Sequence, residues 1–130
     1  MIHEAMIKDT ISWIVNNLEG KLGISDVASR VGYSRGHLQR LFKFYVGESL
    51  ACFIRRHKLK LAIIDIVQSE QRILDVALKF GFESHATFTR AFNKAYGCPP
   101  NKIRAPGVRQ VMLDSISLFY SGDDINVFNL

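Results

Sequence analysis

Two stretches of the sequence repeat one pattern: residues 32–43 read GYSRGHLQRLFK, and residues 81–94 read GFESHATFTRAFNK. The residues before them repeat as well, because ISDVA at 24–28 is matched by ILDVA at 73–77. Each copy therefore has a short apolar segment, a glycine, a serine and a second apolar segment. A short helix, a turn with glycine and an amphipathic second helix form the helix-turn-helix pattern of DNA-binding proteins. The sequence predicts two such units in tandem.

The turn and the second helix of each copy have matching signals. Gly32 and Gly81 can end the first helix in a left-handed conformation, which costs glycine little because it has no Cβ. Ser34 and Ser84 can each cap the N-terminus of the second helix. The residues at helical spacing that should face the core are Leu38, Leu41, Phe42 and Tyr45 in the first copy and Phe88, Ala91, Phe92 and Ala95 in the second.

Three further helices are expected around the repeat. Apolar spacing predicts one over about Ile2–Asn17, and Ser49 can cap a long one that runs to about Gln68. A short helix should start at Pro99 and Pro100, since proline is tolerated in a first turn. We therefore expect an all-α fold of about seven helices, with two tandem helix-turn-helix subdomains joined by a long bridging helix.

The expected domain limits follow the repeat. They are 1–48 for the N-terminal subdomain, 49–68 for the bridging helix, 69–104 for the C-terminal subdomain and 105–130 for a C-terminal tail. The tail matches nothing in the repeat, and its apolar residues, such as Val111 and Ile116, are typical of strands. We expect it to be poorly ordered or loosely docked.

The basic charge is concentrated in one part of the chain. The net charge is +5 over 130 residues, yet residues 35–60 hold seven lysines and arginines against a single acid, Glu48. The segment after Ala105 is acidic on balance. A concentrated positive charge suits a polyanionic partner, so we place double-stranded DNA against the first unit and the bridging helix rather than the tail.

Other classes of function find no support in the sequence. No nucleophile–base pair, metal-ligand cluster or phosphate loop is present, so we expect neither an enzyme nor a cofactor or metal. Cys52 and Cys98 should be buried free thiols. No apolar run approaches the length of a membrane helix, and the N-terminus lacks signal-peptide features. We therefore expect a cytoplasmic protein with no membrane partner.

The repeat resembles the DNA-binding motifs of the AraC/XylS transcription regulators. Residues 32–34 and 37–43 are similar to the family's first motif. Its second motif is matched by residues 73–77, Gly81 and Phe82, and then by further positions: Phe88, Arg90, Phe92, Gly97, Pro99, Pro100 and Arg104. The resemblance covers about residues 7–104. The short N-terminus, without a small-molecule effector domain, is similar to the branch that contains MarA, SoxS, Rob and RamA.

The resemblance implies a mode of action. Members of this branch bind an asymmetric promoter site as monomers, with both recognition helices in successive major grooves, about 34 Å apart. They associate with the nucleoid and activate transcription by contacting RNA polymerase. The genes they control serve the stress response and antibiotic resistance. Two alternatives stay open: a repressor or competitor that occupies related sites, and a protein-interaction module that titrates RNA polymerase.

Candidate DNA contacts lie on the faces opposite the apolar stripes. Arginine can bond guanine bidentately, and glutamine can bond adenine in the same way. Base-reading candidates are Arg35, Gly36, Gln39 and Arg40 in the first unit and His85, Ala86, Thr89 and Arg90 in the second. Phosphate-contact candidates are Ser34, Lys43, Ser49, Arg55, Arg56, Lys58, Ser84 and Arg104. The serines mark helix N-termini, whose free N–H groups attract phosphate. His37 should pack locally, and His57 should be a surface base.

The chain departs from its relatives on these reading faces. The group usually has tryptophan at the position of Gly36 and often two glutamines where this chain has His85 and Ala86. Glycine loses an apolar contact to bases and costs about 1 kcal/mol of helix propensity relative to alanine. We therefore expect the fold and the phosphate contacts to be retained and the base preference to be altered or relaxed.

Overall fold

The computed structural model describes residues 2–119, with side-chain surroundings through residue 115. These residues form seven α-helices and one 3-10 helix, η1, and no strand, so the all-α prediction is confirmed. The elements are α1 (Ile2–Val15), α2 (Ile24–Val31), α3 (Arg35–Val46), α4 (Leu50–Gln68), α5 (Ile73–Lys79), α6 (His85–Tyr96), η1 (Pro100–Arg104) and α7 (Pro106–Phe119). Helix α1 ends two residues earlier than the predicted Asn17.

The first unit packs α1, α2 and α3 around the start of α4. Helix α1 contributes a stripe of isoleucines, and Phe42 of α3 meets Phe53 of α4 with their ring centroids 5.3 Å apart. The fully buried side chains of this core include Ile7, Ile11, Ile14, Leu38, Phe42, Leu50 and Phe53. Burial of such large apolar side chains stabilises the unit by about 1.5–3 kcal/mol each.

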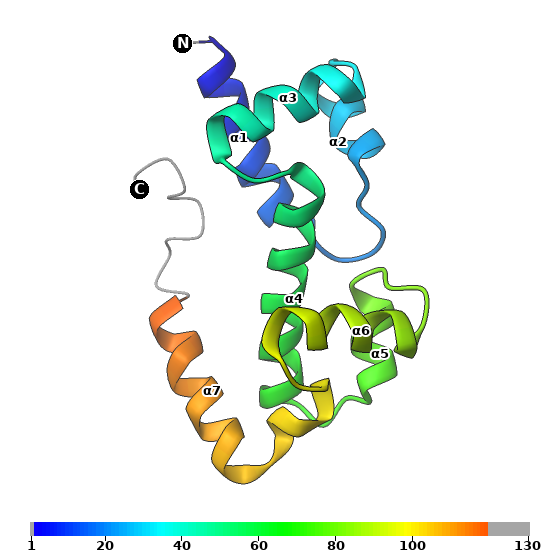
Figure 1. The fold of residues 1–130 in the computed structure, drawn as a ribbon, viewed down its shortest axis with the longest axis vertical. Coiled ribbons are helices and arrows are strands. Elements are labelled where there is room, and N and C mark those ends of the chain that lie inside the picture. The colour runs from blue at the N-terminus through cyan, green and yellow to red at the C-terminus, as the bar shows by residue number, and fades with distance from the viewer. Residues whose placement is uncertain (1, 120–130) are drawn as a thin grey trace.

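The second unit packs α5, α6 and η1 against the rest of α4. Phe88 and Phe92 of α6 are fully buried, and so is Ile103 of η1. Their neighbours come from α4 and α5, including Leu59, Ala62, Ile66, Val76 and Ala77. The two repeats thus have separate cores, and Figure 1 shows α4 running through both units.

The turns of the two units have the predicted geometry. Gly32 and Gly81 lie in the left-handed region, with φ values of 75° and 82°. The Ser34 hydroxyl accepts a hydrogen bond from the backbone N–H of His37 at 3.2 Å, and Ser84 does the same for Thr87 at 3.1 Å. The predicted caps are therefore confirmed, and both recognition helices start at fixed positions.

Residues 106–119 contradict the prediction of a strand-like, poorly ordered tail. They form α7, which turns back after η1 and packs beside α4 (Figure 1). Pro106 starts the helix, where its missing N–H costs nothing. Met112 and Leu113 pack against the second core, and Arg109 pairs with Glu70 at 3.5 Å. The β-branched composition misled the prediction, because packing against α4 overrides intrinsic propensity. The rest of the predicted tail lies outside the described residues.

Two phenylalanines on α3 provide a test of this packing. Phe42 is fully buried, whereas Phe44 is 78% exposed. Phe42→Ala should lower the free energy of unfolding by about 3–5 kcal/mol, because it empties a site in the core. Phe44→Ala should change it by less than about 0.5 kcal/mol. Denaturant unfolding followed by circular dichroism measures both free energies. Equal losses would contradict the difference in burial between Phe42 and Phe44.

Candidate DNA interface

The two recognition helices, α3 and α6, occupy equivalent places in their units. Figure 1 shows them one above the other along α4 and running in the same direction. Each buries one stripe, formed by Leu38 and Phe42 in α3 and by Phe88 and Phe92 in α6. The 19-residue α4 that separates the units is about 28 Å long. This length is close to the 34 Å or so between successive major grooves.

The structure brings the predicted base-reading residues together on the outer faces of these helices. In α3 the exposed residues are Arg35, Gly36, His37, Gln39, Arg40, Lys43 and Phe44. In α6 they are His85, Ala86, Arg90, Asn93, Lys94 and Ala95. Thr89 differs, because it is half-buried and its hydroxyl lies 3.3 Å from Nδ1 of His85. The face of α3 is the more cationic of the two.

Gly36 affects the conformation of its neighbour Arg40. A Cβ added at Gly36 would lie 3.3 Å from a guanidinium nitrogen of Arg40, closer than ordinary contact. The Arg40 side chain therefore folds back over the turn that contains Gly36. A bulky side chain at position 36 would occupy that space and push the guanidinium away. The absence of a side chain at Gly36 and the position of Arg40 are thus coupled.

Several predicted phosphate contacts are exposed or lie at helix ends. Lys43 and Arg55 are exposed on α3 and α4. Arg56 is half-buried, with its guanidinium 2.6 Å from a carboxylate oxygen of Glu48. At the third predicted helix start, Ser49 accepts a hydrogen bond from the N–H of Cys52 at 3.1 Å. The helices that begin after Ser34, Ser49 and Ser84 still offer further N–H groups to an anion.

Lys58 does not fit the prediction of a phosphate contact. Its side chain is 6% exposed, and its ammonium donates to the backbone carbonyls of Gly20 and Phe80, the latter at 2.6 Å. Burial lowers the pKa of the Lys58 ammonium from its ordinary value. The two carbonyls belong to segments 38 and 22 residues away in the sequence. The sequence of α4 alone therefore could not reveal that Lys58 has these partners.

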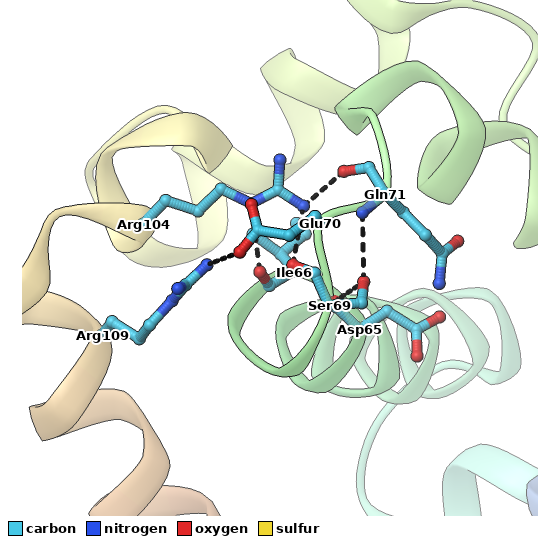
Figure 2. A network of polar contacts seen from close by, with 7 residues as sticks. All are labelled: Asp65, Ile66, Ser69, Glu70, Gln71, Arg104 and Arg109. Atoms are coloured by element: carbon cyan, nitrogen blue, oxygen red, sulfur yellow. Dashed lines mark hydrogen bonds and ion pairs between the residues drawn. The ribbon is translucent and has the colours of Figure 1, made fainter.

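Arg104 is likewise committed to the protein itself rather than to a phosphate. Figure 2 shows its guanidinium against the end of α4, where it donates to the carbonyls of Ile66 at 3.1 Å, Ser69 at 3.3 Å and Gln71. The last carbonyls of a helix lack partners within the helix. Arg104 supplies partners for carbonyls at this helix end and fixes η1 against α4, which does not fit the predicted phosphate contact.

The structure also shows a hollow between α4 and α6 that the sequence reading missed. The basic hollow, as we call it, is lined by Glu48, Cys52, Arg55, Arg56, Leu59, Arg90, Ala91, Lys94, Ala95 and Tyr96. Four cations and one carboxylate line it, and burial raises the pKa of the Tyr96 phenol. Lys94 was not predicted, although its spacing of four residues from Arg90 places both on one helix face.

The structure confirms one prediction about the histidines and cysteines and overturns others. His37 stacks on Tyr33 with ring centroids 4.8 Å apart, as local packing predicts. His57 is not a surface base, since it is 2% exposed and lies 4.2 Å from the Phe53 ring. The cysteines are free thiols, but Cys52 is exposed and Cys98 half-buried, so the expected burial is wrong. Helix α4 turns its His57 side inward and its Cys52 side outward.

Residues 2–119 show neither a metal-ligand cluster nor a membrane-spanning helix. In this part of the chain, no three His, Cys, Asp or Glu side chains are gathered as a metal site. None of the helices described has the length and hydropathy needed to cross a bilayer.

Comparisons with known proteins agree with this arrangement. The family model described as a helix-turn-helix domain matches residues 27–106. The multiple antibiotic resistance protein MarA of Salmonella typhimurium is 41% identical over 98 residues, which are 75% of this chain and 77% of that protein. The chain belongs to the AraC-type family of helix-turn-helix transcription regulators. Its sequence places it in the MarA, SoxS and Rob branch.

Two further relatives of this AraC-type regulator support the assignment. The probable transcription factor PqrA of Proteus vulgaris is 38% identical over 106 residues, 80% of this chain and 87% of that protein. An AraC-type transcriptional regulator from Chromobacterium violaceum has a similar crystal structure, with a TM-score of 0.71 and 28% identity. That similarity covers 78% of this chain and 91% of the other. The protein is therefore a DNA-binding transcription regulator rather than an enzyme.

The role of Arg104 can be tested against a matched residue on the same short helix. Arg104→Gln should lower the free energy of unfolding by about 1–3 kcal/mol, because the carbonyls of Ile66, Ser69 and Gln71 lose a charged donor. Lys102→Gln removes the same charge from an exposed position of η1 and should be near neutral. Denaturant unfolding measures both. A fall of about 1 in the salt slope of DNA binding for Arg104→Gln alone would instead indicate a phosphate contact.

Proposed function

We propose that the protein activates transcription as a monomer that binds one asymmetric promoter site through α3 and α6. The observation that carries this proposal is the parallel arrangement of the two helices along α4 (Figure 1). The exposed faces of both helices bear cations. An asymmetric site follows from the two faces being different. The first has three cations, Arg35, Arg40 and Lys43, whereas the second begins with His85 and Ala86.

The proposed base contacts are divided between the two grooves. In the first groove, Arg35, Gln39 and Arg40 read base edges, and Gly36 leaves the space that a larger side chain would fill. In the second groove, Arg90 is the main reader, accompanied by the imidazole of His85, the methyl of Ala86 and the hydroxyl of Thr89. An arginine bonded to guanine through two hydrogen bonds gives about 1–3 kcal/mol of discrimination. The base preference should therefore differ from that of relatives that carry tryptophan at the position of Gly36.

The proposed phosphate contacts lie beside and between the recognition helices. They comprise Lys43, Arg55 and Arg56, with the helix N-termini that follow Ser34, Ser49 and Ser84. The basic hollow between α4 and α6 adds Lys94 to these contacts. Each neutralised phosphate releases condensed counterions, so the affinity should fall steeply as salt increases.

We further propose that the regulated genes include antibiotic-resistance functions and that activation proceeds through RNA polymerase. The first part rests on the relative named as a multiple antibiotic resistance protein, which is 41% identical over 98 residues. The second rests on the branch of the family to which the chain belongs. A repressor that occupies related sites remains the second candidate, because Gly36 alters a reading face without affecting the buried one.

Selection from random DNA should recover one asymmetric site with two boxes. On that site, Arg40→Ala and Arg90→Ala should each weaken binding by about 1–3 kcal/mol and relax the preference at one box only. Fluorescence anisotropy at several salt concentrations measures the affinity, the base preference and the salt slope.

Lys102→Ala is the matched control, because Lys102 is an exposed cation on η1, outside both reading faces. It should leave the base preference of both boxes unchanged. Equal relaxation of both boxes by Arg40→Ala would contradict the division of the site between α3 and α6. Binding with no sequence preference at physiological salt would instead favour a module that titrates RNA polymerase.

A reporter placed downstream of the selected site distinguishes activation from repression. Expression of the protein should raise reporter output, and Arg40→Ala should reduce the rise because occupancy of the site falls. The same promoter with a scrambled site is the control. A fall in output that depends on the intact site would establish the repressor, and a fall that persists with the scrambled site would indicate titration of RNA polymerase.

A further inference from the structure

A polar contact joins the two units beside α4. The loop after α1 reaches the turn after α5, and the Lys58 ammonium lies between them, donating to the carbonyls of Gly20 and Phe80. The Gly20 N–H donates in turn to the Lys79 carbonyl at 2.7 Å. We call this contact of Gly20, Lys58, Lys79, Phe80 and Gly81 the inter-unit joint.

Ion pairs reinforce the joint at its edge. The Lys79 ammonium lies 2.7 Å from a carboxylate oxygen of Asp65 on α4 and 3.6 Å from one of Glu19 in the loop. The hydrogen bond from Lys79 to Asp65 is the main reason that the pKa of Lys79 is raised. One lysine of α5 thereby contacts both the bridging helix and the first unit.

The position of Gly81 shows how closely the two units approach. A Cβ added at Gly81 would overlap the backbone carbonyl of Gly20 and would lie 2.9 Å from the backbone nitrogen of Lys21. Gly32 is the equivalent residue in the first unit and has a similar φ of 75°, yet nothing lies within 4 Å of its added Cβ. Glycine at position 81 thus serves a contact between units as well as a turn.

Lys58 is an unusual choice for this position if stability alone mattered. Burying an ammonium has a desolvation cost, and here that cost lowers its pKa. An apolar side chain would avoid the cost but would leave two carbonyls without this donor. The lysine therefore links two backbone segments, one from each unit, in a single geometry. That geometry restricts how the second unit can rotate about α4 relative to the first.

We propose that Lys58 is a positioning residue that sets the spacing and rotational phase of α3 and α6, so that the protein selects DNA sites by the separation of their two boxes. This inference rests on the proposed function, in which both helices read one site. One added base pair moves the second box by about 3.4 Å along the axis and also rotates it. A rigid joint cannot follow that change, whereas a flexible one can.

The test compares binding to the selected site with binding to versions that have one base pair added or removed between the boxes. The wild-type protein should prefer the selected spacing. Lys58→Met keeps the apolar stem and removes the donor, and it should reduce this preference by about fivefold or more, a typical size for coupling between sites. Lys8→Met removes the same charge from exposed Lys8 of α1 and should leave the preference unchanged.

A pair of glycine variants tests the joint without changing charge. Gly81→Ala and Gly32→Ala strain equivalent turns, but only Gly81→Ala pushes against Gly20. Gly81→Ala should reduce the spacing preference, and Gly32→Ala should retain it. A purely structural loss would weaken binding to every spacing alike and leave the ratio of affinities intact. Far-UV circular dichroism establishes that each variant is folded.

Amide hydrogen exchange gives a readout without DNA. The Gly20 N–H should exchange faster in Lys58→Met and Gly81→Ala than in wild type or Gly32→Ala. Unchanged Gly20 exchange, or a spacing preference retained in both joint variants, would overturn the inference while leaving the proposed function intact. If the wild-type protein itself shows no spacing preference, the proposed reading of one site by two helices fails, and the role of Lys58 fails with it.

Discussion

The burial of α4 in two successive cores is the constraint on which the other features depend. Phe53 near its start is fully buried in the first core, and Ile66 near its end is fully buried in the second. A single continuous helix therefore carries both units, and its length sets how far apart they lie. The recognition helices inherit their positions from this helix, since Phe42 and Phe92 bury the inner faces of α3 and α6.

Polar contacts outside the two cores add further restraints on how the units sit along α4. The inter-unit joint connects the loop after α1 to the turn after α5, on the flank of α4. At the far end of α4, Arg104 of η1 donates to the Ile66 carbonyl, and Arg109 of α7 pairs with the Glu70 carboxylate (Figure 2). These contacts tie η1 and α7 to the second unit. The bridging helix is thus supported along its length.

The cations of this protein fall into two classes that composition cannot separate. Arg35, Arg40 and Lys43 are exposed on a recognition helix and available to DNA. Lys58 and Arg104 donate to backbone carbonyls of residues 22 to 38 positions away in the sequence. Helical periodicity in the sequence is compatible with either class, so it does not tell them apart. Only the folded chain shows which cations already have partners and which still face solvent.

The sequence by itself determined the two helix-turn-helix units, their caps and their buried stripes, because these depend on residues three or four positions apart. Ser34 and Phe42 are examples, since the cap and the stripe can be recognised within one helix. Tertiary structure decided the rest: the helical state of residues 106–119, the inward position of His57 and the use of Lys58 between the units. Each of these depends on atoms from distant segments, whose approach is set by packing around α4 rather than by any local pattern.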